Sequence, residues 1–292
     1  GTLDAYGFAV RSAARMPTLK QTSALAAELD GDFNGIRVQT LELAHGASSL
    51  TAKGRLTWNP GLSWEAEVRG AHIDPSLLFA DWPGDFSCTL NTEGSFDGND
   101  VRASFHLPQL QGTLRRFPLS GKGEAHLLGR QVRIPMFALT SAGSGVKIQG
   151  EIDDAVNLAL KLQSGNLAEL WPNARGKVDL NAKITGPTAK PEVALKLTGA
   201  GIGLGADRIE AVDLETKGTV TAEGSLAATL KTENAQLGSI HLIQANAQLK
   251  GSLKDHTLVA EARTPEYSTG FTAQGALSDH NWQGTLRETR LS

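Results

Sequence analysis

The chain has 292 residues, a net charge of −3 and 40% apolar residues, which allows a sizeable buried surface and excludes a disordered tail. Its 28 basic and 31 acidic residues nearly cancel and do not cluster, so we expect no nucleic-acid partner. No apolar run reaches the roughly 18 residues of a membrane-spanning helix, no signal peptide is recognisable, and a single Cys forms no internal disulfide. The missing initial Met suggests a segment of a longer protein whose anchoring and targeting parts lie elsewhere.

Few helices are expected along the chain. The stretch TSALAAELDGDF predicts one near residues 22–29. The stretch IDPSLLFADWPG predicts a short helical turn with Asp74 as N-cap and Pro75 in the first position. GNLAELWPN predicts a second such turn with Asn166 as its cap.

Period-2 alternation of apolar and polar residues dominates the rest of the chain and predicts roughly eighteen half-buried β-strands. The connections DGND (97–100) and GPTAKP (186–191) have the composition of hairpin turns. Neighbouring strands should therefore be antiparallel.

Two predicted strands resemble each other. GDFSCTLNTE begins at Gly84 and GKVDLNAKIT at Gly176, and each closely follows a Trp-Pro pair and runs to another Gly ten residues on. The match predicts a repetitive β-structure over residues 1–292 with repeats starting near residues 74 and 166. A chance coincidence in an all-β chain is the alternative.

Strands with one apolar face and few helices to cover it leave three arrangements: a sandwich, a closed barrel, or a curled sheet whose inner face stays open to a ligand. The presumed inner positions are mainly aliphatic, and Phe, Trp and Tyr make up only 5% of the chain. Such a lining is smooth and suits an acyl chain. The residues predicted to line a lipid-binding groove are Phe86, Cys88, Leu90, Val101, Ala103, Phe105, Leu107, Leu158, Leu160, Leu162, Val178, Leu180, Ala182, Ile184, Val193, Leu195, Leu197, Leu226 and Leu230.

Sequence signals for catalysis or cofactors are weak. GIGLGA (Gly201 to Ala206) fits the dinucleotide pattern G-x-G-x-x-A, but no helical pattern follows it, so a Gly-rich turn between strands is predicted. The seven His lie far apart without metal-ligand spacing and are predicted to be solvated strand residues. Cys88 shares the phase of its apolar neighbours and is expected to be a small buried hydrophobe. We therefore expect no enzyme activity, no metal site and no cofactor.

The C-terminal run carries a recurring pattern of Gly, His, Leu and Trp, at Gly251, His256, Leu258, Gly275, Leu277, Trp282, Gly284 and Leu286. Together with the blocks at residues 73–94 and 170–199, this pattern resembles the TamB family of diderm bacteria, which is related to the AsmA-like proteins. The resemblance covers roughly residues 50–292.

The resemblance implies a fold and a location. Proteins of this family are anchored in the inner membrane and cross the periplasm towards TamA, an outer-membrane barrel. Their fold is an all-β, elongated, curled, mostly antiparallel sheet, U-shaped or taco-like, with an apolar inner groove.

Two functions follow from the resemblance. In the first, the groove is expected to carry phospholipid acyl chains between the inner and outer membranes in support of outer-membrane biogenesis. Alternatively, the segment is a scaffold or chaperone that assists TamA in assembling nascent outer-membrane proteins, such as autotransporters, by strand addition.

Overall fold

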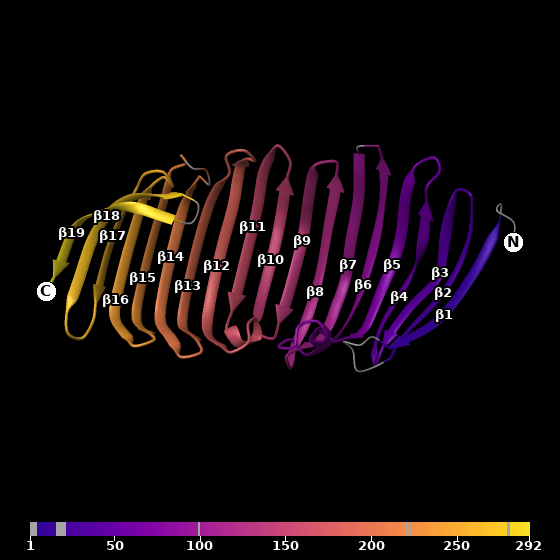
Figure 1. Ribbon diagram of the computed structural model, residues 1–292, viewed down its shortest axis with the longest axis horizontal. Coiled ribbons are helices and arrows are strands. Elements are labelled where there is room, and N and C mark those ends of the chain that lie inside the picture. Colours follow the sequence, from indigo (N-terminus) through magenta and orange to yellow (C-terminus); the bar gives the residue numbers. More distant parts are fainter. Residues whose placement is uncertain (1–4, 16–21, 99, 220, 222, 279–280) are drawn as a thin grey trace. The chain divides into compact units, whose positions relative to one another are not determined.

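The computed structural model describes residues 5–15, 22–98, 100–219, 221, 223–278 and 281–292 (Figure 1). Within these ranges the chain forms nineteen β-strands and two 3₁₀ turns, and it contains no α-helix. The strands group into two compact units, Gly1–Ala142 and Gly143–Ser292. The all-β prediction is therefore confirmed.

The first unit contains nine strands and the 3₁₀ turn η1, and each strand pairs in antiparallel register with the next. The bounds are β1 (Tyr6–Arg15), β2 (Thr22–Asp32), β3 (Gly35–His45), β4 (Ser48–Thr57), β5 (Leu62–Ile73), η1 (Pro75–Leu77), β6 (Gly84–Asp97), β7 (Asp100–Leu114), β8 (Phe117–Leu128) and β9 (Gln131–Ser141).

The second unit contains ten strands and the turn η2, again paired in chain order and antiparallel. The bounds are β10 (Ser144–Ile152), β11 (Ala155–Ser164), η2 (Leu167–Glu169), β12 (Ala174–Pro187), β13 (Glu192–Leu204), β14 (Asp207–Thr219), β15 (Leu226–Leu237), β16 (Ile240–Gly251), β17 (His256–Arg263), β18 (Ser268–Ser278) and β19 (Asn281–Leu291). Because each strand pairs with its sequence neighbour, each unit is a single sheet, and the sandwich alternative is wrong for both units.

The predicted helix near residues 22–29 is wrong, because this stretch is strand β2. Its Ala, Leu and Glu residues favour a helix on their own. In the structure, Leu25 and Ala27 pair with Leu43 and Leu41 of β3, so that all four side chains lie on one face. Tertiary pairing thus overrides the local preference.

The two helical turns are confirmed, each as a single 3₁₀ turn. The Asp74 carboxylate accepts from the Ser76 N–H at 3.0 Å and from the Gly84 N–H at 3.0 Å. The Asn166 side chain accepts from the Ala168 N–H at 3.2 Å. In each unit the turn lies between two paired strands, and the second of these has 14 residues.

The predicted connections between strands are also confirmed. The stretch DGND closes the β6–β7 hairpin, in which Asp97 pairs with Asp100, and GPTAKP lies at the β12–β13 hairpin. Within GIGLGA, Gly205 has a φ of 61° in the turn between β13 and β14, and strand β14 follows it rather than a helix. A left-handed backbone of this kind favours glycine.

β-Bulges explain how two prolines lie inside strands. Pro108 lies where the β7 register shifts between Leu107 and Leu110, and Pro135 lies at the β8–β9 shift between Glu124 and His126. A bulge leaves one residue outside the hydrogen-bond ladder, so the missing proline N–H costs nothing there. The bulges also bend the strands and increase their twist.

The interior of the chain is small for its mass. Among the described residues only seven apolar side chains are buried, and no large side chain is fully buried. The accessible surface is 18784 Å², against about 12,000 Å² for a compact chain of this mass. Most apolar side chains of the sheets therefore remain partly open to solvent.

Candidate functional site

A row of five leucines crosses one face of the second unit. Antiparallel partners point to the same face of a sheet, and Leu162, Leu180, Leu197, Leu214 and Leu230 are successive partners across β11 to β15. With about 4.8 Å between strands, this leucine row extends over roughly 19 Å. It runs perpendicular to the strands.

Two further rows of partners follow one after the other on one side of the leucine row, on the same face. One contains Ile148, Leu160, Ala182, Leu195, Thr216, Ala228, Leu249, Leu258 and Ala273. The other contains Gly150, Leu158, Ile184, Val193, Gly218, Leu226, Gly251, His256 and Gly275. None of these three rows contains an Asp, Glu, Lys or Arg, so the surface that they share is apolar; we call it the apolar face.

The first unit has an apolar face of the same kind. Leu25, Leu43, Leu50, Gly70 and Cys88 are successive partners across β2 to β6. The three leucines are 39%, 42% and 41% exposed, which is high for leucines in the middle of a sheet. Nothing in the described part of this unit covers them.

All nineteen residues predicted to line a groove lie on the apolar face of their own unit by strand register and phase. Ala103 and Val178 are buried, Phe105 and Leu230 are 41% and 36% exposed, and the others are half-buried. Cys88 is half-buried rather than buried. Lipid binding by these residues stays a prediction.

Charged residues occupy the opposite, polar face. On β4 and β5 of the first unit, the Glu67 carboxylate accepts from Lys53 Nζ at 3.3 Å and from Arg69 Nε at 2.9 Å. Partial burial, the largest single effect, raises the pKa of Glu67, but the hydrogen bonds and charges of these two cations together lower it below its ordinary value. Exposed pairs of this kind contribute little to stability.

Two hollows of the first unit lie over this polar face. One of about 990 Å³ is lined by side chains including Arg37, Lys53, Glu65 and Glu93. Another of about 500 Å³ extends over the polar face towards His126. Polar residues make up most of the lining of both, although the smaller hollow also touches Trp64, Ala103 and Leu127, so neither hollow is the predicted apolar groove.

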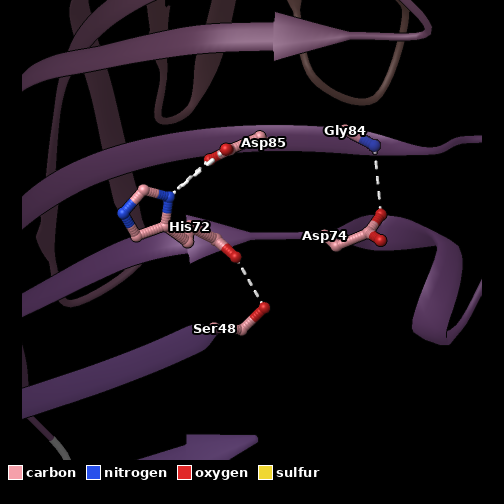
Figure 2. A network of polar contacts seen from close by, with 5 residues as sticks. All are labelled: Ser48, His72, Asp74, Gly84 and Asp85. Atoms are coloured by element: carbon pink, nitrogen blue, oxygen red, sulfur yellow. Dashed lines mark hydrogen bonds and ion pairs between the residues drawn. The ribbon is translucent and has the colours of Figure 1, made fainter. Parts of the chain in front are cut away.

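A serine, a histidine and an aspartate meet at one end of β5 (Figure 2). His72 Nδ1 lies 3.0 Å from Asp85 Oδ1, but the Ser48 hydroxyl donates to the main-chain oxygen of His72 and not to its ring. This is not the geometry of an activated nucleophile, which needs the hydroxyl bonded to the imidazole. The contacts instead link β4, β5 and β6 beside η1.

No group of three or more His, Cys, Asp or Glu side chains in the described residues could hold a metal ion. No helix of the described chain is long and apolar enough to cross a membrane.

His256 corrects the prediction of solvated histidines. Its side chain is only 6% exposed, and its Nε2 atom lies 2.9 Å from Nε1 of Trp282. Its partners on the neighbouring strands are Gly251 and Gly275. The recurring pattern of Gly, His and Trp in the sequence could have indicated this contact. Its members Gly251, His256, Gly275 and Gly284 are successive partners across β16 to β19, and Trp282 lies beside them.

Comparison with known proteins supports the resemblance drawn from the sequence. The family model described as "TamB, N-terminal domain" matches residues 1–292. The translocation and assembly module subunit TamB of Haemophilus influenzae is 22% identical over 272 residues, covering 90% of this chain and 20% of that protein, so the chain spans about a fifth of this relative. No solved structure matches the chain significantly. Because the family model matches along the whole chain, the chain belongs to the TamB family.

Proposed function

We propose that the apolar face binds the acyl chains of phospholipids and forms part of a periplasmic bridge along which they pass between the inner and outer membranes. The observation that carries this proposal is the leucine row, which is partly open to solvent and is followed on one side by two rows without Asp, Glu, Lys or Arg. The five leucines of the row offer no hydrogen bonds to polar ligands. The row suits a ligand that is itself a hydrocarbon.

The energetics favour this ligand. Each methylene removed from water contributes about 0.8 kcal/mol, so a sixteen-carbon chain exposed to water costs on the order of 12 kcal/mol. Contact with a continuous apolar face offsets much of that cost and so lowers the free energy of passage from a bilayer to the face. The segment therefore acts by solvation, without catalysis or a cofactor, and the direction of transport is set elsewhere.

A second candidate function is assistance in protein assembly. The relative from Haemophilus influenzae is named as a subunit of a translocation and assembly module. In this alternative, the segment works with a TamA-like barrel and binds nascent outer-membrane proteins by strand addition. Its ligand is then an unfolded polypeptide and not a lipid.

The proposal is tested by native mass spectrometry after incubation with phospholipid vesicles, comparing Leu180→Asp with Asn181→Asp. Leu180 is the second member of the leucine row, whereas the exposed Asn181 lies opposite Lys161 and Lys196 on the polar face. A carboxylate in the row stays hydrated, and its water separates the acyl chain from the sheet at that point. If the acyl chain loses contact over about two methylenes, the amount of bound lipid should fall about tenfold. Asn181→Asp adds the same charge and should bind lipid as the wild type does.

Circular dichroism must first show that both variants keep their β-structure. Undiminished lipid binding by a folded Leu180→Asp variant would show that the row does not carry the acyl chain. A wild-type chain that binds no lipid but binds an unfolded outer-membrane protein tightly would favour the assembly alternative.

A further inference from the structure

Unlike the leucine row, the row that contains His256 includes a hydrogen-bonded imidazole. The Trp282 indole N–H only donates, so His256 Nε2, 2.9 Å away, must accept. The remaining ring proton then lies on Nδ1, which donates to the Ser252 main-chain oxygen at 3.0 Å. Both ring nitrogens are thus bonded, and the imidazole is neutral in this arrangement.

The Trp282 ring lies flat against the sheet because two glycines leave room for it. A Cβ atom at Gly275 or at Gly284 would fall on atoms of the indole. The ring therefore covers two adjacent strands, β18 and β19, at their partner positions. It places a large apolar surface where the row has no side chains of its own.

We propose that His256 is a positioning residue that, as a neutral imidazole, holds Trp282 flat and keeps the apolar face continuous across β16 to β19. This inference rests on the proposed lipid-carrying function and makes lipid contact with β16 to β19 depend on pH. A doubly protonated ring carries a hydrogen on Nε2 that opposes the indole N–H, so the bond is lost. Acid therefore releases Trp282 and places a positive charge on the apolar face.

The groups around His256 do not supply a dedicated carboxylate for that charge. In the adjoining turn, Lys254 is paired with Glu223 at 2.8 Å, and the Asp255 carboxylate accepts from Gln274 at 3.0 Å. On β16 and β18, glycines lie directly opposite. Lys250, Glu261, Arg263 and Glu288 hold positions on the polar face, and Arg287 lies at the register shift of β19 between Leu286 and Glu288.

The test uses a phospholipid with a photoreactive diazirine in its acyl chain, crosslinked to the purified chain at pH 7.5 and at pH 5.0. Peptide mapping separates adducts in β11–β15 from adducts in β17–β19. In the wild type, labelling of β17–β19 should fall roughly five- to tenfold at pH 5.0, as expected for one lost hydrogen bond, while labelling of β11–β15 changes little.

Three variants separate positioning from a general structural role. His256→Gln offers an amide oxygen to the Trp282 N–H and does not titrate, so it should label β17–β19 equally at both pH values. His256→Phe offers no acceptor and should label β17–β19 weakly at both. His241→Gln changes an exposed histidine and should keep the wild-type pH profile.

The outcomes distinguish this inference from the proposed function. Absence of labelling in β11–β15 of the wild type at pH 7.5 would overturn both. If β11–β15 is labelled but His256→Gln still loses labelling of β17–β19 in acid, only the positioning role is overturned. Hydrogen exchange of β17 and β18 shows whether each variant stays folded. If His256→Phe unfolds locally, the pH profile of His256→Gln alone decides whether His256 positions Trp282.

Discussion

Single glycines decide where aromatic side chains can lie on the apolar face. In the first unit, a Cβ atom at Gly94 would fall on the ring of Trp64, its partner on β5, and the Trp64 N–H donates to the Thr92 hydroxyl at 3.2 Å. In the second unit Trp282 also lies over glycines, Gly275 and Gly284, although its direct partner is Leu277. Glycine within a strand normally weakens it. Here it allows a large ring to lie flat instead of projecting from the sheet.

Asp74 provides a prediction at the residue scale. The Ser76 N–H chiefly lowers the pKa of this carboxyl, partial burial opposes it, and the Ser76 hydroxyl and Gly84 N–H lower it further. A lowered pKa in the folded state means that the carboxylate stabilises the fold above about pH 3.9 and loses this effect as the pH falls through the folded value. Asp74→Ala should therefore lower the free energy of unfolding by about 1 kcal/mol at pH 7 and by much less at pH 2.

Urea titrations at the two pH values measure this difference. Asp81→Ala changes an exposed carboxylate of the same loop and should have little effect at either pH. An equal loss of stability at pH 7 and pH 2 in Asp74→Ala would show that the negative charge is not what matters.

At the scale of strands, the sequence predicts most elements because period 2 is a local signal. It fails for β2, whose residues favour a helix until β3 pairs with them. The register of two strands is harder to predict from the sequence than the strands themselves. A bulge such as the shift between Leu107 and Leu110 changes which residues face each other. The contact between His256 and Trp282, 26 residues apart, depends on two successive hairpins and was not predicted.

The face assignment of β6 is tested with Cys88, the one cysteine of the chain. Cys88 is half-buried between Gly70 and Leu110 on the apolar face, whereas Glu93 is exposed on the polar face. A charged maleimide should label Cys88 several-fold more slowly than it labels Cys88→Ser/Glu93→Cys. Stopped-flow labelling measures both rates, and the denatured chains provide the reference. Equal rates in the folded proteins would place Cys88 on the solvent face and shift the register by one residue.

For the whole chain, the sequence left open whether the apolar faces cover one another. Alternation is the same in a sandwich and in a single sheet, so only the order of strand pairing decides between them. Each unit pairs its strands in chain order, and its apolar side chains stay partly exposed. Large apolar surfaces of this kind mark binding sites.

The exposed surface predicts dye binding by the native protein. A fluorescent hydrophobic dye should bind the folded chain at pH 7 without loss of far-UV circular dichroism, because the surface it needs is present before unfolding. Lysophospholipid should displace it. A compact β-sandwich of similar mass serves as the reference, and dye fluorescence no higher than that of the reference would contradict an uncovered apolar face.

Pairing in chain order also constrains how such a sheet can change in length. Inserting one strand would move every later turn to the opposite edge, whereas inserting a hairpin restores the original direction of the chain. The insertion adds two strands, or about 9.6 Å, and leaves the flanking rows in register. Length can therefore change in discrete increments of one hairpin, without redesign of the surface on either side.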